Sequence, residues 1–121
     1  MDAAEVASRV DADLDAYFYL PLSREEAGTS GTPWSEQRER TELALLRQSL
    51  VSPVLIDVVD VDQSPSRRNL VKLWLVAVAP NNSLVLYDPI SDEFALAVGD
   101  PSDRPETINV RGDLCSTFIA R

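Results

Sequence analysis

The ten residues Leu70–Ala79, LVKLWLVAVA, decide the fold of this chain. Lys72 is the only charged residue among them, and the run has the length of a strand, far short of a membrane-spanning helix. A nearly continuous apolar run of this length is typical of a strand that is covered on both faces. Side chains alternate along a strand, which predicts Trp74, Val76 and Val78 on one face and Leu73, Leu75 and Ala77 on the other.

Further strand-like segments flank this one. Short turns separate neighbouring segments, among them Pro80–Ser83 and Asp88–Asp92. A short turn joins antiparallel strands, because a parallel pair needs a long crossover connection. The pattern predicts an antiparallel meander of four to six strands. Its other members are Val54–Val61, Leu84–Tyr87, Phe94–Val98, Thr107–Val110 and Cys115–Ala120.

Two helices are expected before the sheet. Asp2 and Glu5 suit the positive end of the first helix dipole. Thr32 as N-cap and Pro33 at the first helical position start the second helix, which runs to about Leu50. We therefore predict one α+β domain over residues 1–121, with two N-terminal helices packed on the antiparallel meander. The apolar stripe of the first helix consists of Ala3, Val6, Ala7, Val10, Leu14, Tyr17 and Phe18.

The second face of the sheet poses a question, because two helices can cover only one face. Strong curvature of the sheet, or another part of the chain, is the commoner solution, and we favour it over a partner or a ligand. A homodimer that buries the second face is a further hypothesis, which the mass in solution would test.

The composition restricts the chemistry. The chain has 20 acidic and 11 basic residues, no histidine and a net charge of −9. Without histidine there is no Ser-His or Cys-His nucleophile pair and no histidine-based zinc site, so we expect a non-enzymatic protein with no cofactor and no metal. The negative charge argues against nucleic acid and anionic membranes, and it favours a basic protein partner. Biased amino-acid usage or adaptation to high salt are alternative explanations for the acidity.

The single cysteine, Cys115, cannot form an internal disulfide. Residues 1–15 are acidic and lack the basic and apolar regions of a secretion signal. We therefore expect a reducing, cytoplasmic location. A buried, inert thiol is the favoured interpretation of Cys115, which has no nearby base in the sequence.

The leading functional hypothesis is an acidic protein-interaction domain, for example a bacterial inhibitor or immunity-type protein. Asp88, Asp92 and Glu93 cluster around a proline turn, and we predict that they contact a basic partner. Trp34, at the start of the second helix, either packs into the core, which is the commoner case, or projects as the candidate aromatic anchor for the partner.

The alternative hypothesis is a small-ligand binder or enzyme of the cone-shaped α+β type. There a curved sheet would surround an apolar pocket. Asp57 would be its polar group and Trp74 would line it. A cavity that contains both residues would favour this alternative, and a filled core would argue against it.

Overall fold

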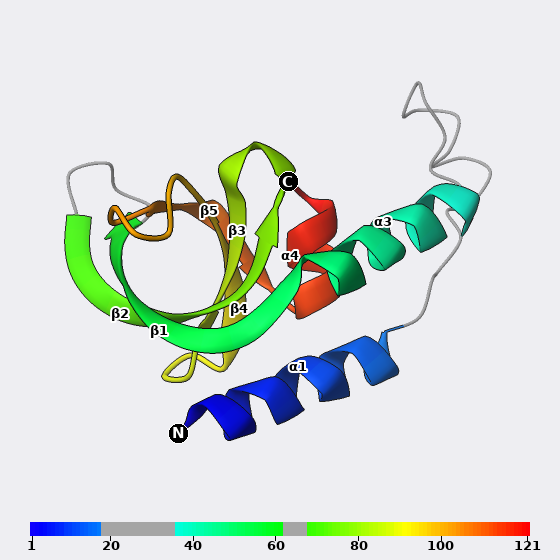
Figure 1. Ribbon diagram of the computed structural model, residues 1–121, viewed down its shortest axis with the longest axis horizontal. Coiled ribbons are helices and arrows are strands. Elements are labelled where there is room, and N and C mark those ends of the chain that lie inside the picture. Colours follow the sequence, from blue (N-terminus) through cyan, green and yellow to red (C-terminus); the bar gives the residue numbers. More distant parts are fainter. Residues whose placement is uncertain (18–35, 62–67) are drawn as a thin grey trace.

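Five strands follow one another as a meander, as the short turns predict. In the computed structural model, which describes residues 1–17, 36–61 and 68–121, two N-terminal helices precede these strands and a third helix follows them (Figure 1). The predicted α+β class, with two N-terminal helices and an antiparallel meander, is confirmed. In chain order the elements are α1 (Ala3–Ala16), α3 (Glu36–Ser49), β1 (Leu50–Val61), β2 (Arg68–Ala79), the 3-10 turn η1 (Pro80–Asn82), β3 (Ser83–Asp88), β4 (Glu93–Val98), β5 (Glu106–Gly112) and α4 (Leu114–Ile119).

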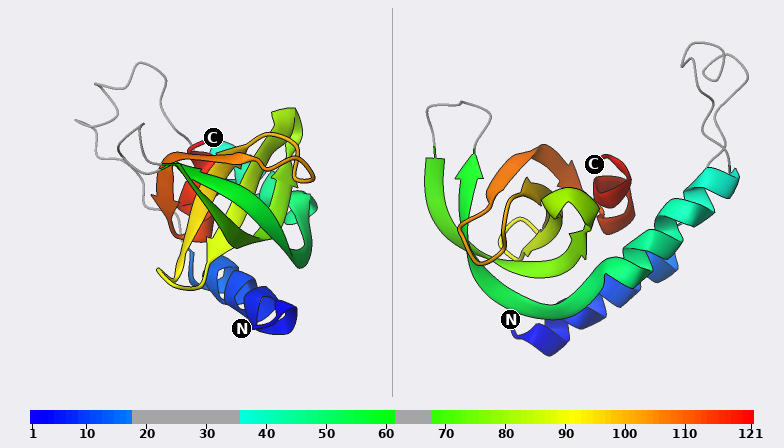
Figure 2. Two further views of the ribbon diagram at one scale, coloured as in Figure 1. Left: turned by 90° about the vertical axis from the view of Figure 1, so that its left-hand side faces the viewer. Right: turned by 45° about the horizontal axis from the view of Figure 1, so that its top comes forward.

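The sheet curls until its first and last strands meet. Consecutive strands pair antiparallel, and β1 then meets β5 in parallel at Val59 and Glu106, which closes a barrel (Figure 2). The Val59 amide donates to the carbonyl of Pro105 at 2.9 Å, and the Val61 amide donates to the Thr107 hydroxyl at 2.9 Å. The closure therefore depends on a few hydrogen bonds at the end of β1.

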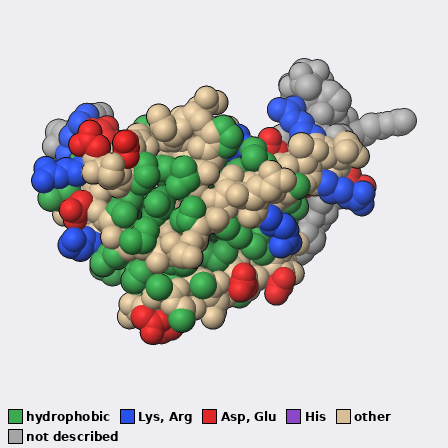
Figure 3. Space-filling model, in the orientation of Figure 1, with side chains coloured by type: hydrophobic (Ala, Val, Ile, Leu, Met, Phe, Trp, Pro, Cys, Tyr) green, Lys and Arg blue, Asp and Glu red, His purple; other side chains and the backbone are tan. Residues whose placement is uncertain are grey.

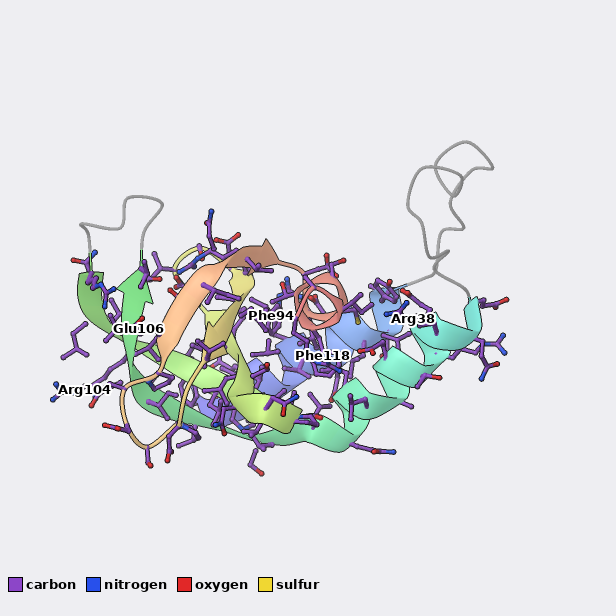
Figure 4. All side chains as sticks on the ribbon, turned by 90° about the horizontal axis from the view of Figure 1, so that it is seen from above. Arg38, Phe94, Arg104, Glu106 and Phe118 are labelled. Atoms are coloured by element: carbon purple, nitrogen blue, oxygen red, sulfur yellow. The ribbon has the colours of Figure 1, made fainter. Side chains whose placement is uncertain are left out.

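Curvature supplies the cover for the second sheet face. Side chains on the inner face of the barrel form a buried cluster of their own, and the opposite face packs against the helices. Phe94 of β4 and Phe118 of α4 both lie in this second layer, between the barrel and the helices (Figure 4). The inner cluster consists of Val58, Leu73, Leu75, Leu84, Leu86 and Ala97.

The predicted alternation of β2 fails beyond Leu75. The register between β2 and β3 shifts between Leu75 and Ala77, so one extra residue is accommodated there and the two faces exchange. As a result Ala77 is buried on the helix side together with Val76, and Val78 is 37% exposed. The predictions for Ala77 and Val78 were therefore wrong.

The predicted strand Cys115–Ala120 is instead the helix α4. Asp113 caps its first turn by accepting a hydrogen bond from the Ser116 amide at 3.0 Å, and Asp13 of α1 accepts one from the Leu114 amide at 2.9 Å. The buried positions include Leu114 and Phe118, at helical spacing. Apolar and β-branched residues gave this segment its strand-like composition, and the cap by Asp113 stabilises it as a helix.

Helix α1 buries the centre of the predicted apolar stripe, but Ala3 is exposed, Tyr17 is the C-cap beyond the helix, and Phe18 lies outside the described residues. Val6, Val10 and Leu14 are buried at intervals of four residues. Asp2 and Glu5 form a capping box, in which each side chain bonds the backbone amide of the other residue. The predicted start of the second helix at Thr32 and Pro33 lies outside the described residues. Among the helices that the structure describes, none is long and apolar enough to cross a membrane.

Candidate functional site

The turn between β3 and β4 holds the three predicted carboxylates. Asp88 and Glu93 are paired at the end of the hairpin, and Arg111 of β5 reaches both of them. Its guanidinium lies 3.4 Å from Asp88 and 3.6 Å from Glu93, and it is 2.7 Å from Asp60 of β1. Burial alone would lower the pKa of Arg111, but Asp60 and Asp88 raise it, so the cation is firmly charged. Three carboxylates thus share one guanidinium group.

Asp92, at the other end of the turn, connects the hairpin to α1. Its Oδ1 accepts a hydrogen bond from the Tyr87 hydroxyl at 2.5 Å and one from Arg9 Nε at 3.0 Å. These two bonds, the tyrosine first, hold the pKa of Asp92 below its ordinary value. Arg9 also pairs with Asp13 on α1 and lies over the Phe94 ring. The turn therefore contacts the flank of α1 that carries Arg9 and Asp13.

Ile90 projects from the tip of this turn. It is 98% exposed, whereas the next most exposed large apolar residues in the described chain reach 59%. The turn that carries it is well held, because the Ile90 amide donates to Asp88 Oδ1 at 3.0 Å and Asp92 is fixed at its other end. Ile90 was not predicted as a site residue from the sequence. The available signal was an isoleucine at the centre of a turn, where polar residues predominate.

Helix α1 contributes two carboxylates that were not predicted as site residues from the sequence. Asp11 and Asp15 are exposed, lie four residues apart and have no cationic partner among the described residues. Asp11 and Asp15 lie roughly 200° around the helix from Arg9 and Asp13, and Asp11 borders the segment 50–53 of β1. We call Asp11 and Asp15, together with Asp88, Asp92 and Glu93, the acidic surface, which therefore extends over both flanks of α1. Acidic side chains lie along the lower edge of Figure 3, along which α1 runs in Figure 1.

The two residues of the ligand-binding alternative are not brought into one cavity. Asp57 is exposed on β1 and accepts a hydrogen bond from Lys72 Nζ at 3.0 Å. It lines a polar surface hollow of about 280 Å³, which the loop 101–104 also borders. Trp74 is half-buried and packs against the helix-side core. The inner face of the barrel is filled by the buried cluster around Val58 and Leu86.

The remaining candidates divide between buried and undescribed positions. Cys115 is buried in α4, and burial followed by the charge of Asp113 raises its pKa to about 11, so its thiol is protonated at neutral pH. Trp34 lies outside the described residues. Within residues 1–17, 36–61 and 68–121, no three His, Cys, Asp or Glu side chains are placed to hold a metal ion.

Comparison with known proteins adds no identity. No protein-family model, no curated protein and no solved structure matches this chain.

Proposed function

We propose that this protein is a non-enzymatic interaction domain that binds a basic protein partner through the acidic surface. An inhibitor or immunity-type protein, which blocks its partner by occupying a cationic site, is the concrete form we favour. The lone cysteine suits a reducing compartment, and we place the interaction in the cytoplasm.

The uneven distribution of charge is the observation that carries the proposal. Helix α1 with its N-cap has five acidic residues and one arginine, whereas α3 has three of each. Together α1 with its N-cap and the β3–β4 turn hold eight carboxylates. Arg9 pairs with Asp13 and Asp92, and Arg111 pairs with Asp88 and Glu93, so these segments and the two arginines have a net charge of −6, without Asp60, which also pairs with Arg111. A general bias of composition would have made both helices acidic.

The positions of these acids work against the stability of α1. Asp15 lies in the last turn, where the helix dipole disfavours a negative charge by about 0.3–1 kcal/mol. Asp11 and Asp15 also repel each other across one helical turn, which costs a few tenths of a kcal/mol more. That last turn contains no basic residue. Acids at positions that destabilise their own helix are best explained by a role outside the fold.

The β3–β4 turn has the properties of a docking element. It is held by Arg9, Tyr87 and Arg111, so little conformational freedom is lost when it binds. Ile90 at its tip would enter an apolar pocket, and the surrounding carboxylates would meet lysines or arginines at the rim. Long-range attraction by the acidic surface would accelerate the encounter with such a partner.

The test selects peptides from a random 12-residue phage library on the immobilised wild-type protein. We expect enrichment of sequences that combine lysine or arginine with a large apolar residue. Binding of the best peptide should fall at least about tenfold in the double variant Asp11→Lys/Asp15→Lys, and it should weaken as salt rises from about 0.05 to 0.5 M. Ile90→Ser should weaken the same peptide without changing the salt dependence.

The matched control is the double variant Glu36→Lys/Asp103→Lys. It changes the net charge by the same amount at exposed positions outside the acidic surface. The two double variants have the same net charge, so they differ only in short-range contacts and in the local potential at the acidic surface. The control should therefore bind the peptide with an affinity within about threefold of that of the wild type. The proposal would be contradicted by an equal loss of peptide affinity in both double variants, or by enrichment of peptides that lack basic residues.

A further inference from the structure

One face of the β1–β2 ribbon is left uncovered by the helices, and the loop 101–104 borders it beside Asp57 and Lys72. Cross-strand neighbours on this face are Asp57 with Lys72 and Val59 with Leu70, while Leu55 borders the face beside Trp74. Leu55 and Leu70 are 44% and 59% exposed, and the ribbon extends away from α1, α3 and α4 (Figures 1 and 2). We call Leu55, Asp57, Val59, Leu70 and Lys72 the outer ribbon face.

The charge on this face is balanced, unlike that of the chain as a whole. Lys72 is the only lysine in the sequence, and it pairs with Asp57 at 3.0 Å. An apolar pair, Val59 with Leu70, lies on one side of the ion pair, and Leu55 lies on the other. A strongly basic or acidic partner would gain little from a neutral face, whereas a second copy of it offers complementary charges.

We propose that the outer ribbon face mediates a symmetric homodimer of this chain. In this dimer the two faces stack on each other, and the two-fold axis runs parallel to the strands, midway between the faces. Each residue of one copy then lies over the residue of the other copy that is its cross-strand neighbour within the chain. Asp57 of one copy then faces Lys72 of the other, twice, and Val59 faces Leu70, twice. The face is therefore complementary to itself in both charge and apolar character.

The size of the face sets the strength of this association. Seven residues of each strand give a face roughly 20 Å long and about 10 Å wide. The area of such a face is well below the roughly 800 Å² that each partner buries in a stable complex. The dimer is therefore weak, and the fraction of dimer depends on the protein concentration. Two chains of charge −9 also repel each other, and salt screens that repulsion. Dimerisation should strengthen with salt, the reverse of the salt dependence proposed for the acidic surface.

The experiment is sedimentation equilibrium of the full chain from about 10 μM to 1 mM, at about 0.05 and 0.5 M salt. The average mass should rise from 13.3 kDa toward twice that value, and further at the higher salt. Leu70→Lys should keep the protein monomeric at every concentration. Ile90→Lys introduces the same side chain at the most exposed large apolar position of the described residues and should dimerise like the wild type.

Two single charge reversals make the test specific for the two-fold arrangement. Asp57→Lys alone and Lys72→Asp alone should each remain monomeric, because like charges then face each other across the axis. An equimolar mixture of the two variants should form a heterodimer, because each lysine then faces an aspartate. A wild-type monomer at 1 mM, a dimer that survives Leu70→Lys, or a mixture that stays monomeric overturns the proposal. None of these results affects peptide binding by the acidic surface.

Discussion

At the scale of single residues, Glu39 is the most unusual group in the described chain. It lies on α3, only 3% exposed, and the hydroxyl of Tyr17 donates a hydrogen bond to it. Burial, and then the nearby charge of Glu42, raises the pKa of Glu39 above its ordinary value of 4.5. A carboxylate in this position favours protonation in the folded state, so it links stability to pH.

The sign of this linkage leads to a prediction. Because the folded pKa is raised, the stabilisation is complete below the unfolded value of about 4.5 and is lost as pH rises through the folded pKa. Glu39→Gln keeps an acceptor for Tyr17 and does not ionise. The difference in unfolding free energy, variant minus wild type, should therefore increase from pH 4.5 upward and then level off. Urea unfolding at a series of pH values measures it, and a difference that falls with pH would contradict the assignment.

At the scale of elements, Asp13 attaches α1 to the rest of the fold. Its carboxylate pairs with Arg9 and accepts a hydrogen bond from the Leu114 amide at the start of α4. Asp15, two residues later, makes no such contact and faces solvent. The same residue type thus has opposite effects on stability at two neighbouring positions in one helix.

Alanine substitution at each position should separate these effects. Asp13→Ala removes a capping acceptor for α4 and should cost about 1–2 kcal/mol of unfolding free energy. Asp15→Ala removes a charge that opposes the helix dipole and should stabilise the protein by about 0.3–1 kcal/mol. Chemical denaturation of both variants and the wild type gives the comparison. Equal destabilisation by the two substitutions would show that the contact of Asp13 with α4 contributes nothing.

Elements with a strong local pattern were predictable from the sequence, and those fixed by distant contacts were not. The stripe Val6, Val10 and Leu14 defines α1 within its own segment, so periodicity was sufficient. Helix α4 depends on Asp13, a hundred residues away, as well as on its own cap. The carboxylates of the β3–β4 turn were visible as a cluster, but their link to α1 is a contact between Arg9 and Asp92 that no local pattern encodes.

At the scale of the whole molecule, closure of the barrel is the property that the sequence could not reveal. The meander follows from short turns, and a meander can equally remain open. Closure here joins the end of β1 to β5 through Val59 and Glu106, with Arg111 and Thr107 both bonded to Asp60. These contacts link positions about fifty residues apart. Thr107 of β5 has the central role among them because its hydroxyl makes two hydrogen bonds to β1.

The hydroxyl of Thr107 accepts from the Val61 amide and donates to Asp60, at 2.9 Å in each case. Thr107→Val keeps the shape of this buried side chain but leaves both groups without that partner, which should cost about 1–3 kcal/mol. Hydrogen exchange should then accelerate most at the Val59 and Val61 amides, because the β1–β5 junction opens first.

Thr117 provides the matched control for this experiment. It is equally buried, and its hydroxyl is the one buried side-chain polar atom in the described residues that has no hydrogen-bond partner. Thr117→Val removes an unsatisfied polar group and should leave stability unchanged or raise it by up to about 1 kcal/mol. The two substitutions are chemically identical. If their changes in unfolding free energy differ in sign, the difference comes from the hydrogen bonds of Thr107 at the closure and not from the loss of a hydroxyl. If both variants lose the same stability, the Thr107 bonds do not hold the barrel closed.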